Sequence, residues 1–103
     1  MDLLQRLRQI CPQDQEVLEE YIKTIEQAAV LFAKKQADYG PGNIAKFGEI
    51  GLLVRMSDKL ERLINLITSK REPNNEAIED TLLDILNYAA IWLIVRRVSI
   101  PHR

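Results

Sequence analysis

The chain has 103 residues, of which 47% are apolar, and its 14 basic and 15 acidic side chains leave a net charge of −1. This length fits a single domain, residues 1–103, and the lack of a basic excess argues against binding to duplex nucleic acid as the main role. A single cysteine excludes an intrachain disulfide, and the longest apolar run, Tyr88–Val95, is too short to cross a membrane, so we expect a cytoplasmic protein without membrane contact.

Glycine and proline gather at a few breaks, and the stretches between them consist of good helix formers. The pattern predicts a short helix over residues 2–10 and a long helix over 14–39 with Asp14 as its N-cap. A third helix is expected over 48–69 and a last one over 75–98. We therefore predict an all-α fold, an antiparallel bundle of three long helices plus a short N-terminal helix.

The last predicted helix is apolar nearly all the way round, with no charged side chain between Asp84 and Arg96. A domain of this size buries only about two-thirds of its unfolded surface, so its own core is thin. We therefore expect a second subunit to cover part of this helix in a homo-oligomer.

A line of polar side chains runs along the first half of that helix, where Asp80, Asp84 and Asn87 are spaced i, i+4, i+7 among apolar neighbours. A carboxylate in such surroundings needs a cation, a proton or a metal ion. Two carboxylates one turn apart suit Mg²⁺ or Mn²⁺, which prefer oxygen ligands. Alternatively, Asp80 and Asp84 pair with basic side chains of a neighbouring helix, or Asp80 complements the helix dipole.

The third helix carries a mixed charge pattern in which Arg55, Asp58 and Arg62 share one side and Glu61 follows Asp58 by three residues. If this helix packs beside the last one, Asp58 and Glu61 join the acidic line in a four-carboxylate cluster for Mg²⁺. Arg55, Lys59 and Arg62 would then neutralise a polyphosphate. The alternative is a ladder of ion pairs in which the arginines neutralise Asp58.

The end of the long helix combines charge, a phenol and a chain break in Lys34, Asp38 and Tyr39, and the following loop contains Asn43 and Lys46. The loop can present backbone N–H groups, and the lysines add positive charge, so we count these residues as candidates for substrate binding. No Walker motif is present in the sequence. Alternatively, Lys34 and Asp38 are only a helix-stabilising pair and the loop is only a turn.

Three segments in this order resemble a known family. They are K-x-x-x-D-Y-G from Lys34, G-x-L-V-R-x-x-D-K-x-x-R-L from Gly51 and E-D-T-L-L-D-I-x-N-Y-A from Glu79. Together they resemble nucleotide-modification-associated domain 1, which is found in bacteria and their phages and is similar to the MazG-like all-α nucleoside triphosphate pyrophosphatases. The resemblance covers roughly Lys34 to Trp92.

The resemblance implies a helical fold that pairs into dimers or tetramers and a role in nucleotide metabolism. For the pyrophosphatases it also implies Mg²⁺ held by E-x-x-E on one helix and E-x-x-D on the next. Here Asp58 and Glu61 stand at the first motif, and Asp84 matches the last acid of the second. Thr81 stands where the second motif has glutamate, and Asp80 lies one residue earlier.

On this basis we expect a Mg²⁺-dependent nucleoside triphosphate pyrophosphohydrolase that acts on a (deoxy)nucleotide. Glu61 would position the attacking water, Asp84 would hold the metal, and Tyr39 or Asn87 would contact the base or sugar. One alternative is a non-catalytic nucleotide-binding module, which the missing glutamate favours. Another is a structural oligomer whose acidic side chains are paired with arginines.

Overall fold

The computed structural model describes residues 2–40, 46–69 and 75–98. Its elements are α1 (Leu3–Ile10), α2 (Gln15–Tyr39), α3 (Gly48–Thr68) and α4 (Asn75–Arg97), and no strand occurs within these ranges. Each helix begins and ends within one residue of its expected boundary, so the all-helical prediction is confirmed. Among the described helices, none combines the length and the apolar character that a membrane span needs.

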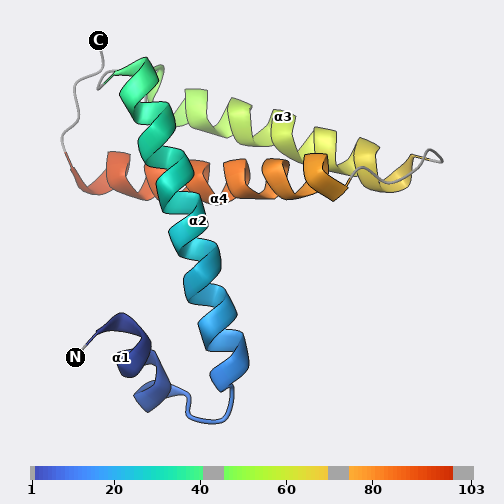
Figure 1. Cartoon of the computed structure of the whole chain (residues 1–103). Helices are drawn as coiled ribbons and strands as arrows, with labels where there is room; N and C mark the ends of the chain where they lie inside the picture. The colour runs from blue at the N-terminus through green and yellow to red at the C-terminus, as the bar shows by residue number, and fades with distance from the viewer. Residues whose placement is uncertain (1, 41–45, 70–74, 99–103) are drawn as a thin grey trace.

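The helices do not form one parallel-sided bundle. α3 and α4 lie alongside each other as an antiparallel hairpin, whereas α2 crosses α4 at a steep angle (Figure 1). The C-terminal half of α2 lies on the hairpin, and its N-terminal half projects past the hairpin and packs against α1. The antiparallel arrangement predicted from the sequence therefore holds for α3 and α4, and α2 departs from it.

Local signals explain most of the helix ends. The Asp2 carboxylate caps α1 by accepting a hydrogen bond from the Gln5 backbone N–H. The side-chain oxygen of Gln5 in turn accepts one from the Asp2 backbone N–H. Gly40 ends α2 with a positive φ of 84°, a conformation that glycine adopts without strain. Asp14 does occupy the N-cap position of α2, but its side chain makes no capping bond and instead accepts one from the Cys11 thiol.

The core is small and lies where α4 contacts its two neighbours. The radius of gyration is 16.2 Å, against about 13 Å for a compact domain of 100 residues. Many large apolar side chains are at least half exposed. The buried side chains of the described residues are Ala28, Leu52, Leu63, Thr81 and Ile91.

A polar cluster links the N-terminus of α3 to the C-terminal part of α4. The Glu49 carboxylate, in the first turn of α3, accepts hydrogen bonds from the Trp92 indole and from the Arg96 guanidinium, the latter at 2.8 Å. These two bonds lower the pKa of Glu49 below its ordinary value. Trp92, the single tryptophan, therefore reports on the contact between α3 and α4.

Gly51 has little space around it in the first turns of α3, so we predict that alanine destabilises the fold there. An added Cβ would lie 2.7 Å from the Lys46 carbonyl oxygen and 2.8 Å from the Phe47 Cβ. We expect Gly51→Ala to lower the free energy of unfolding by about 1–2 kcal/mol, although alanine is the better helix former. Urea unfolding followed by Trp92 fluorescence measures this loss. Ser57→Ala, at an exposed position of the same helix, is the control, and an equal response of both variants would contradict the prediction.

Candidate functional site

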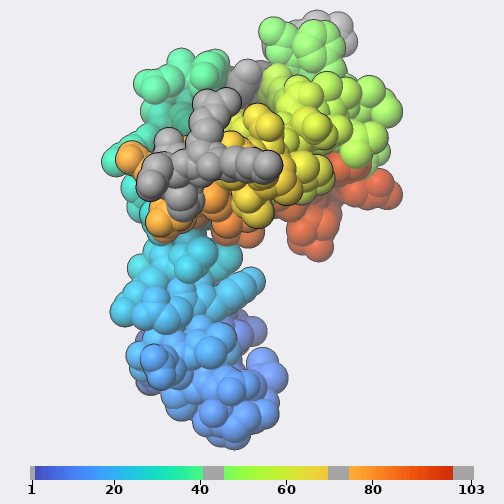
Figure 2. Space-filling view, turned by 90° about the vertical axis from the view of Figure 1, so that its right-hand side faces the viewer, coloured from blue at the N-terminus to red at the C-terminus, as the bar shows by residue number. Residues whose placement is uncertain are grey.

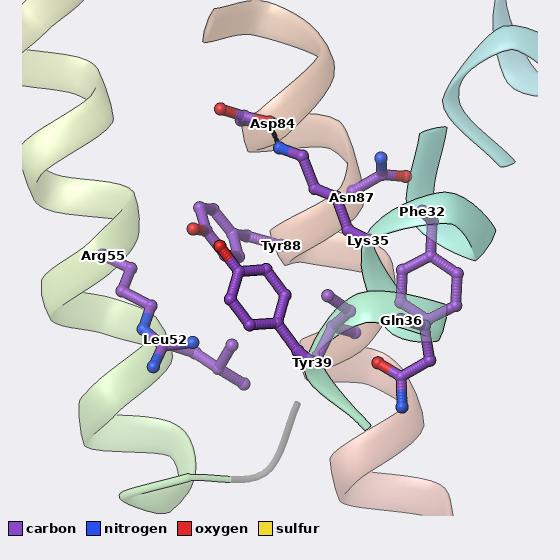
Figure 3. A pocket seen from close by; sticks show the side chains of 10 residues that line it. Phe32, Lys35, Gln36, Tyr39, Leu52, Arg55, Asp84, Asn87 and Tyr88 are labelled. Atoms are coloured by element: carbon purple, nitrogen blue, oxygen red, sulfur yellow. Dashed lines mark hydrogen bonds and ion pairs between the residues drawn. The ribbon is translucent and has the colours of Figure 1, made fainter. Parts of the chain in front are cut away.

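A pocket with both polar and apolar lining lies where α2, α3 and α4 meet. Its volume is about 260 Å³, and Figure 3 shows charged, phenolic and amide side chains around it. α4 forms its floor, and α2 and α3 form its walls. The lining residues are Phe32, Lys35, Gln36 and Tyr39 from α2, Leu52 and Arg55 from α3, and Asp84, Asn87, Tyr88 and Ile91 from α4.

The α2 wall of the pocket follows from helix periodicity. Phe32, Lys35, Gln36 and Tyr39 are spaced i, i+3, i+4, i+7, so they share one face of α2. This face is held on α4 by the Asn87 amide, which donates a hydrogen bond of 3.0 Å to a backbone carbonyl of α2. Asn87 thus sets the position of α2 as well as lining the pocket.

Asp84 stands between two lysines from different helices. Its carboxylate oxygens lie 2.8 Å from Lys35 Nζ on α2 and 2.9 Å from Lys59 Nζ on α3. The Asp84 side chain is only 17% exposed. Burial raises its pKa, but the hydrogen bonds from the two lysines together outweigh burial, so the pKa of Asp84 lies below its ordinary value. The bond to Asp84 raises the pKa of Lys35 in turn.

These pKa shifts predict that the Asp84–Lys35 ion pair contributes most to the free energy of unfolding at intermediate pH and less at either extreme. Because the pKa of Asp84 is lowered on folding, its contribution is present above about pH 4, the unfolded value, and is lost as the pH falls through the folded pKa. Because the pKa of Lys35 is raised, its contribution is present below about pH 10 and is lost as the pH rises through the folded pKa.

The difference in unfolding free energy between the wild type and Asp84→Asn measures this contribution. We expect no more than about 1 kcal/mol near pH 7, because Lys35 is half exposed, and less at pH 3 and pH 11. A difference that does not change with pH would contradict the ion-pair assignment.

A shallower hollow adjoins the pocket along α3. It shares Arg55 and Tyr88 with the pocket, and its other lining residues are Asp58, Lys59 and Arg62. The side of α3 predicted to carry Arg55, Asp58 and Arg62 together therefore does face the pocket region. The predicted ladder is not formed in this region, since neither arginine makes an ion pair with a described residue.

Other predicted site residues lie elsewhere. Lys34 and Asp80 line a separate hollow formed by α2 and α4. Asp38 and Lys46 are exposed and line none of the pockets described here, and Lys46 lies over the Phe47 ring at 5.5 Å. Asn43 falls outside the described residues.

The four predicted metal ligands do not converge within the described part of the chain. Asp84 is held by lysines, and Asp80 lines the other hollow. Glu61 is exposed two positions after Lys59, so it points to the opposite side of α3. No group of three or more acidic, histidine or cysteine side chains that could hold a metal ion occurs among the described residues. The alternative for Asp84, pairing with basic side chains of neighbouring helices, is what the structure shows, with Lys35 and Lys59 in place of the expected arginines.

Thr81 is turned away from the pocket. Thr81 is 2% exposed, and its hydroxyl donates a 2.7 Å hydrogen bond to the Ala77 carbonyl. It lies eleven positions before Trp92 and therefore on the same side of α4, the side that contacts α3 through Glu49. The threonine therefore serves packing at this position. A glutamate here would be buried.

Comparison with known proteins leaves the family open: no protein-family model, curated protein or solved structure matches the chain. The resemblance to the nucleotide-modification-associated domain therefore rests on its three motifs, and the activity that it implies stays a prediction. Sequence reasoning missed six of the lining residues as site residues: Phe32, Lys35 and Gln36 on α2, Leu52 on α3, and Tyr88 and Ile91 on α4. For the three on α2, the i, i+3, i+4, i+7 spacing with Tyr39 was the signal that could have found them.

Proposed function

We propose that the protein binds a nucleotide in the pocket between α2, α3 and α4, and that it acts in cytoplasmic nucleotide metabolism. One observation carries the proposal: Lys35 and Lys59 hold the Asp84 carboxylate from two helices, and Arg55 lines the same pocket without an ion pair to a described residue. Residues from all three sequence motifs meet at this place, with Tyr39 from the first, Arg55 from the second and Asp84 from the third.

The charges suit a phosphate chain. Counted over the pocket and the adjoining hollow, the four cationic side chains exceed the two carboxylates, so the region favours an anion. The cations are Lys35, Arg55, Lys59 and Arg62, and the carboxylates are Asp84 and Asp58. Phosphate oxygens can accept the lysine hydrogen bonds that Asp84 now accepts. Arg55 makes no ion pair with a described residue, so its guanidinium is available for a bidentate contact with phosphate.

The remaining lining suits a base and a sugar. Tyr39 and Tyr88 present aromatic rings beside the cations, as Figure 3 shows, and aromatic rings stack on nucleobases. The amide nitrogens of Gln36 and Asn87 already donate to backbone carbonyls, which leaves their carbonyl oxygens as acceptors for a ligand N–H or O–H.

Hydrolysis to a nucleoside monophosphate and pyrophosphate is the second candidate function. It is favoured by the carboxylates at the pocket, Asp84 in its lining and Asp58 in the adjoining hollow. In this reaction a water oxygen attacks the α-phosphorus, the bond from this phosphorus to the oxygen bridging to the β-phosphorus breaks, and a carboxylate takes the proton of the water. Glu61, on the opposite side of α3 from Lys59, does not fit that role within one chain.

Mg²⁺ or Mn²⁺ stays a prediction for this reaction. The described residues of one chain do not offer a set of three carboxylates, so we derive no catalytic step through a metal ion. Adding or withholding the ion in the assay tests the dependence directly.

The deciding experiment combines titration calorimetry with a pyrophosphate-release assay on canonical and modified nucleoside triphosphates, each with and without Mg²⁺. Binding without the metal that becomes tighter in Asp84→Asn would support an anion site, because the substitution removes the competing carboxylate. Mg²⁺-dependent release that is lost in Asp84→Asn would support the hydrolase. The absence of any binding or product with all nucleotides would refute both and leave a structural role.

A further inference from the structure

We propose that Gln36 makes the pocket select nucleotides whose base has an amino group at the edge remote from the sugar, over nucleotides with an oxo group there. This rests on the proposed function, because it requires a nucleotide to bind in the pocket. The observation behind it is the fixed orientation of the Gln36 amide. Its nitrogen donates a 3.0 Å hydrogen bond to the Gly40 carbonyl, and its oxygen accepts no hydrogen bond from a described residue.

The bond to Gly40 prevents the Gln36 amide from turning round. Only the nitrogen of a glutamine amide carries hydrogen, so only the nitrogen can bond to a carbonyl oxygen. A half turn would set the amide oxygen against the Gly40 carbonyl and lose the bond. In Figure 3 the oxygen lies on the side toward Tyr39. The group that Gln36 offers to the pocket is therefore an acceptor, whereas a freely turning glutamine can offer either kind of group.

Gln36 lies at the end of the pocket remote from the ion pairs of Asp84. In Figure 3, it lies level with Leu52 along the hairpin and well away from the Asp84 carboxylate. Ile91 follows Asp84 on α4 by two turns, about 10 Å, and Leu52 precedes Lys59 on α3 by the same distance. Leu52 and Ile91 are both buried. The pocket therefore has a charged end and a more apolar end, and Gln36 belongs to the second.

This polarity gives a bound nucleotide a direction. If its phosphates bind the lysines, its base lies toward Gln36 and the apolar side chains. At the edge remote from the sugar, cytosine and adenine present an amino group, whereas uracil, thymine and guanine present a carbonyl oxygen. The amino group can donate to the Gln36 oxygen, but a carbonyl oxygen leaves both acceptors unpaired beside apolar side chains. A site built to hydrogen-bond one group rejects the analogue that lacks it.

Titration calorimetry with two pairs of nucleotides that differ at this edge tests the proposal: CTP against UTP, and ATP against inosine triphosphate. We expect the wild type to bind the amino member of each pair about 10- to 100-fold more tightly. Gln36→Met removes the acceptor at similar volume and should reduce each ratio to about twofold or less. Gln36→Glu also loses the bond to Gly40 but keeps an acceptor, so it should retain the preference.

Gln15→Met is the matched control. The amide nitrogen of Gln15 also donates to a backbone carbonyl, that of Pro12, at 2.9 Å. However, Gln15 begins the half of α2 that extends away from the hairpin, drawn in blue in Figure 2. We therefore expect the wild-type ratios for Gln15→Met.

The outcomes separate this proposal from the proposed function. Equal binding within both pairs would overturn the selectivity and leave nucleotide binding in place. Tighter binding of the oxo members would also overturn it and would assign the base edge to Arg55, a donor of the same lining. Unchanged ratios in Gln36→Met, a loss in Gln36→Glu or an equal loss in Gln15→Met would overturn the role of Gln36. No binding of any nucleotide would overturn both proposals.

Discussion

Thr81→Glu is expected to lower the free energy of unfolding by about 3–5 kcal/mol, because it places an unpaired carboxylate inside the contact between α3 and α4. Thr81 is 2% exposed, and no cation among the described residues bonds to it. Urea unfolding monitored by circular dichroism and Trp92 emission measures the loss.

Thr68→Glu provides a matched control. Thr68 makes the same kind of hydrogen bond as Thr81, from its hydroxyl to the carbonyl four residues earlier, but it is exposed at the end of α3. We expect a change of less than about 1 kcal/mol there. A stable Thr81→Glu protein that gains Mg²⁺ affinity would instead show that position 81 belongs to a metal site, as the family resemblance implies.

Lys59→Gln should weaken nucleotide binding by about 10- to 100-fold, which is what the loss of one charge-assisted hydrogen bond to phosphate amounts to. The side chain is 30% exposed and is already held at the pocket by Asp84. Titration calorimetry with the nucleoside triphosphate that binds the wild type measures the change.

Lys34→Gln is the comparison for this experiment, because Lys34 is an exposed lysine in the separate hollow with Asp80. We expect its affinity to stay within about twofold of the wild type. The pocket assignment would be wrong if Lys34→Gln weakened binding more than Lys59→Gln.

The helices could be predicted from the sequence because their ends are set by local chemistry. Glycine at position 40 and the short polar breaks act within a few residues of each helix end, and this range is visible in a linear pattern. The crossing of α2 over α4 could not be predicted in this way. The crossing depends on which face of α4, a nearly all-apolar helix, packs against Ala28. It also depends on the hydrogen bond from Asn87 to the Ala28 carbonyl, which joins residues 59 positions apart.

The candidate site could be predicted only in part, for the same reason. Asp84, Asn87, Arg55 and Tyr39 do reach one pocket, since each lies on a helix face that meets a neighbour. The predicted four-carboxylate cluster required Glu61 to face α4, and helix geometry turns it away.

The choice between the adjacent residues Lys34 and Lys35 could not be predicted from the sequence either. Lys34 and Lys35 differ by about 100° round the helix, so only the packing of α2 decides which of them enters the pocket. The family motif favoured Lys34, whereas the face that contains Phe32 and Tyr39 selects Lys35.

The two walls of the pocket belong to helices that both pack on a third helix, α4, and within the described ranges do not pack on each other. α2 and α3 each pack on α4 and make no direct backbone contact in the described ranges, so the width of the pocket follows the crossing angle of α2. Among the residues that the structure describes, Asp84 is the one whose side chain bonds to both walls. A phosphate chain that binds both Lys35 and Lys59 would link α2 directly to α3 and so restrict the motion of α2 relative to the α3–α4 hairpin. Slower amide hydrogen exchange in the C-terminal half of α2 would then accompany binding, even without a change in shape.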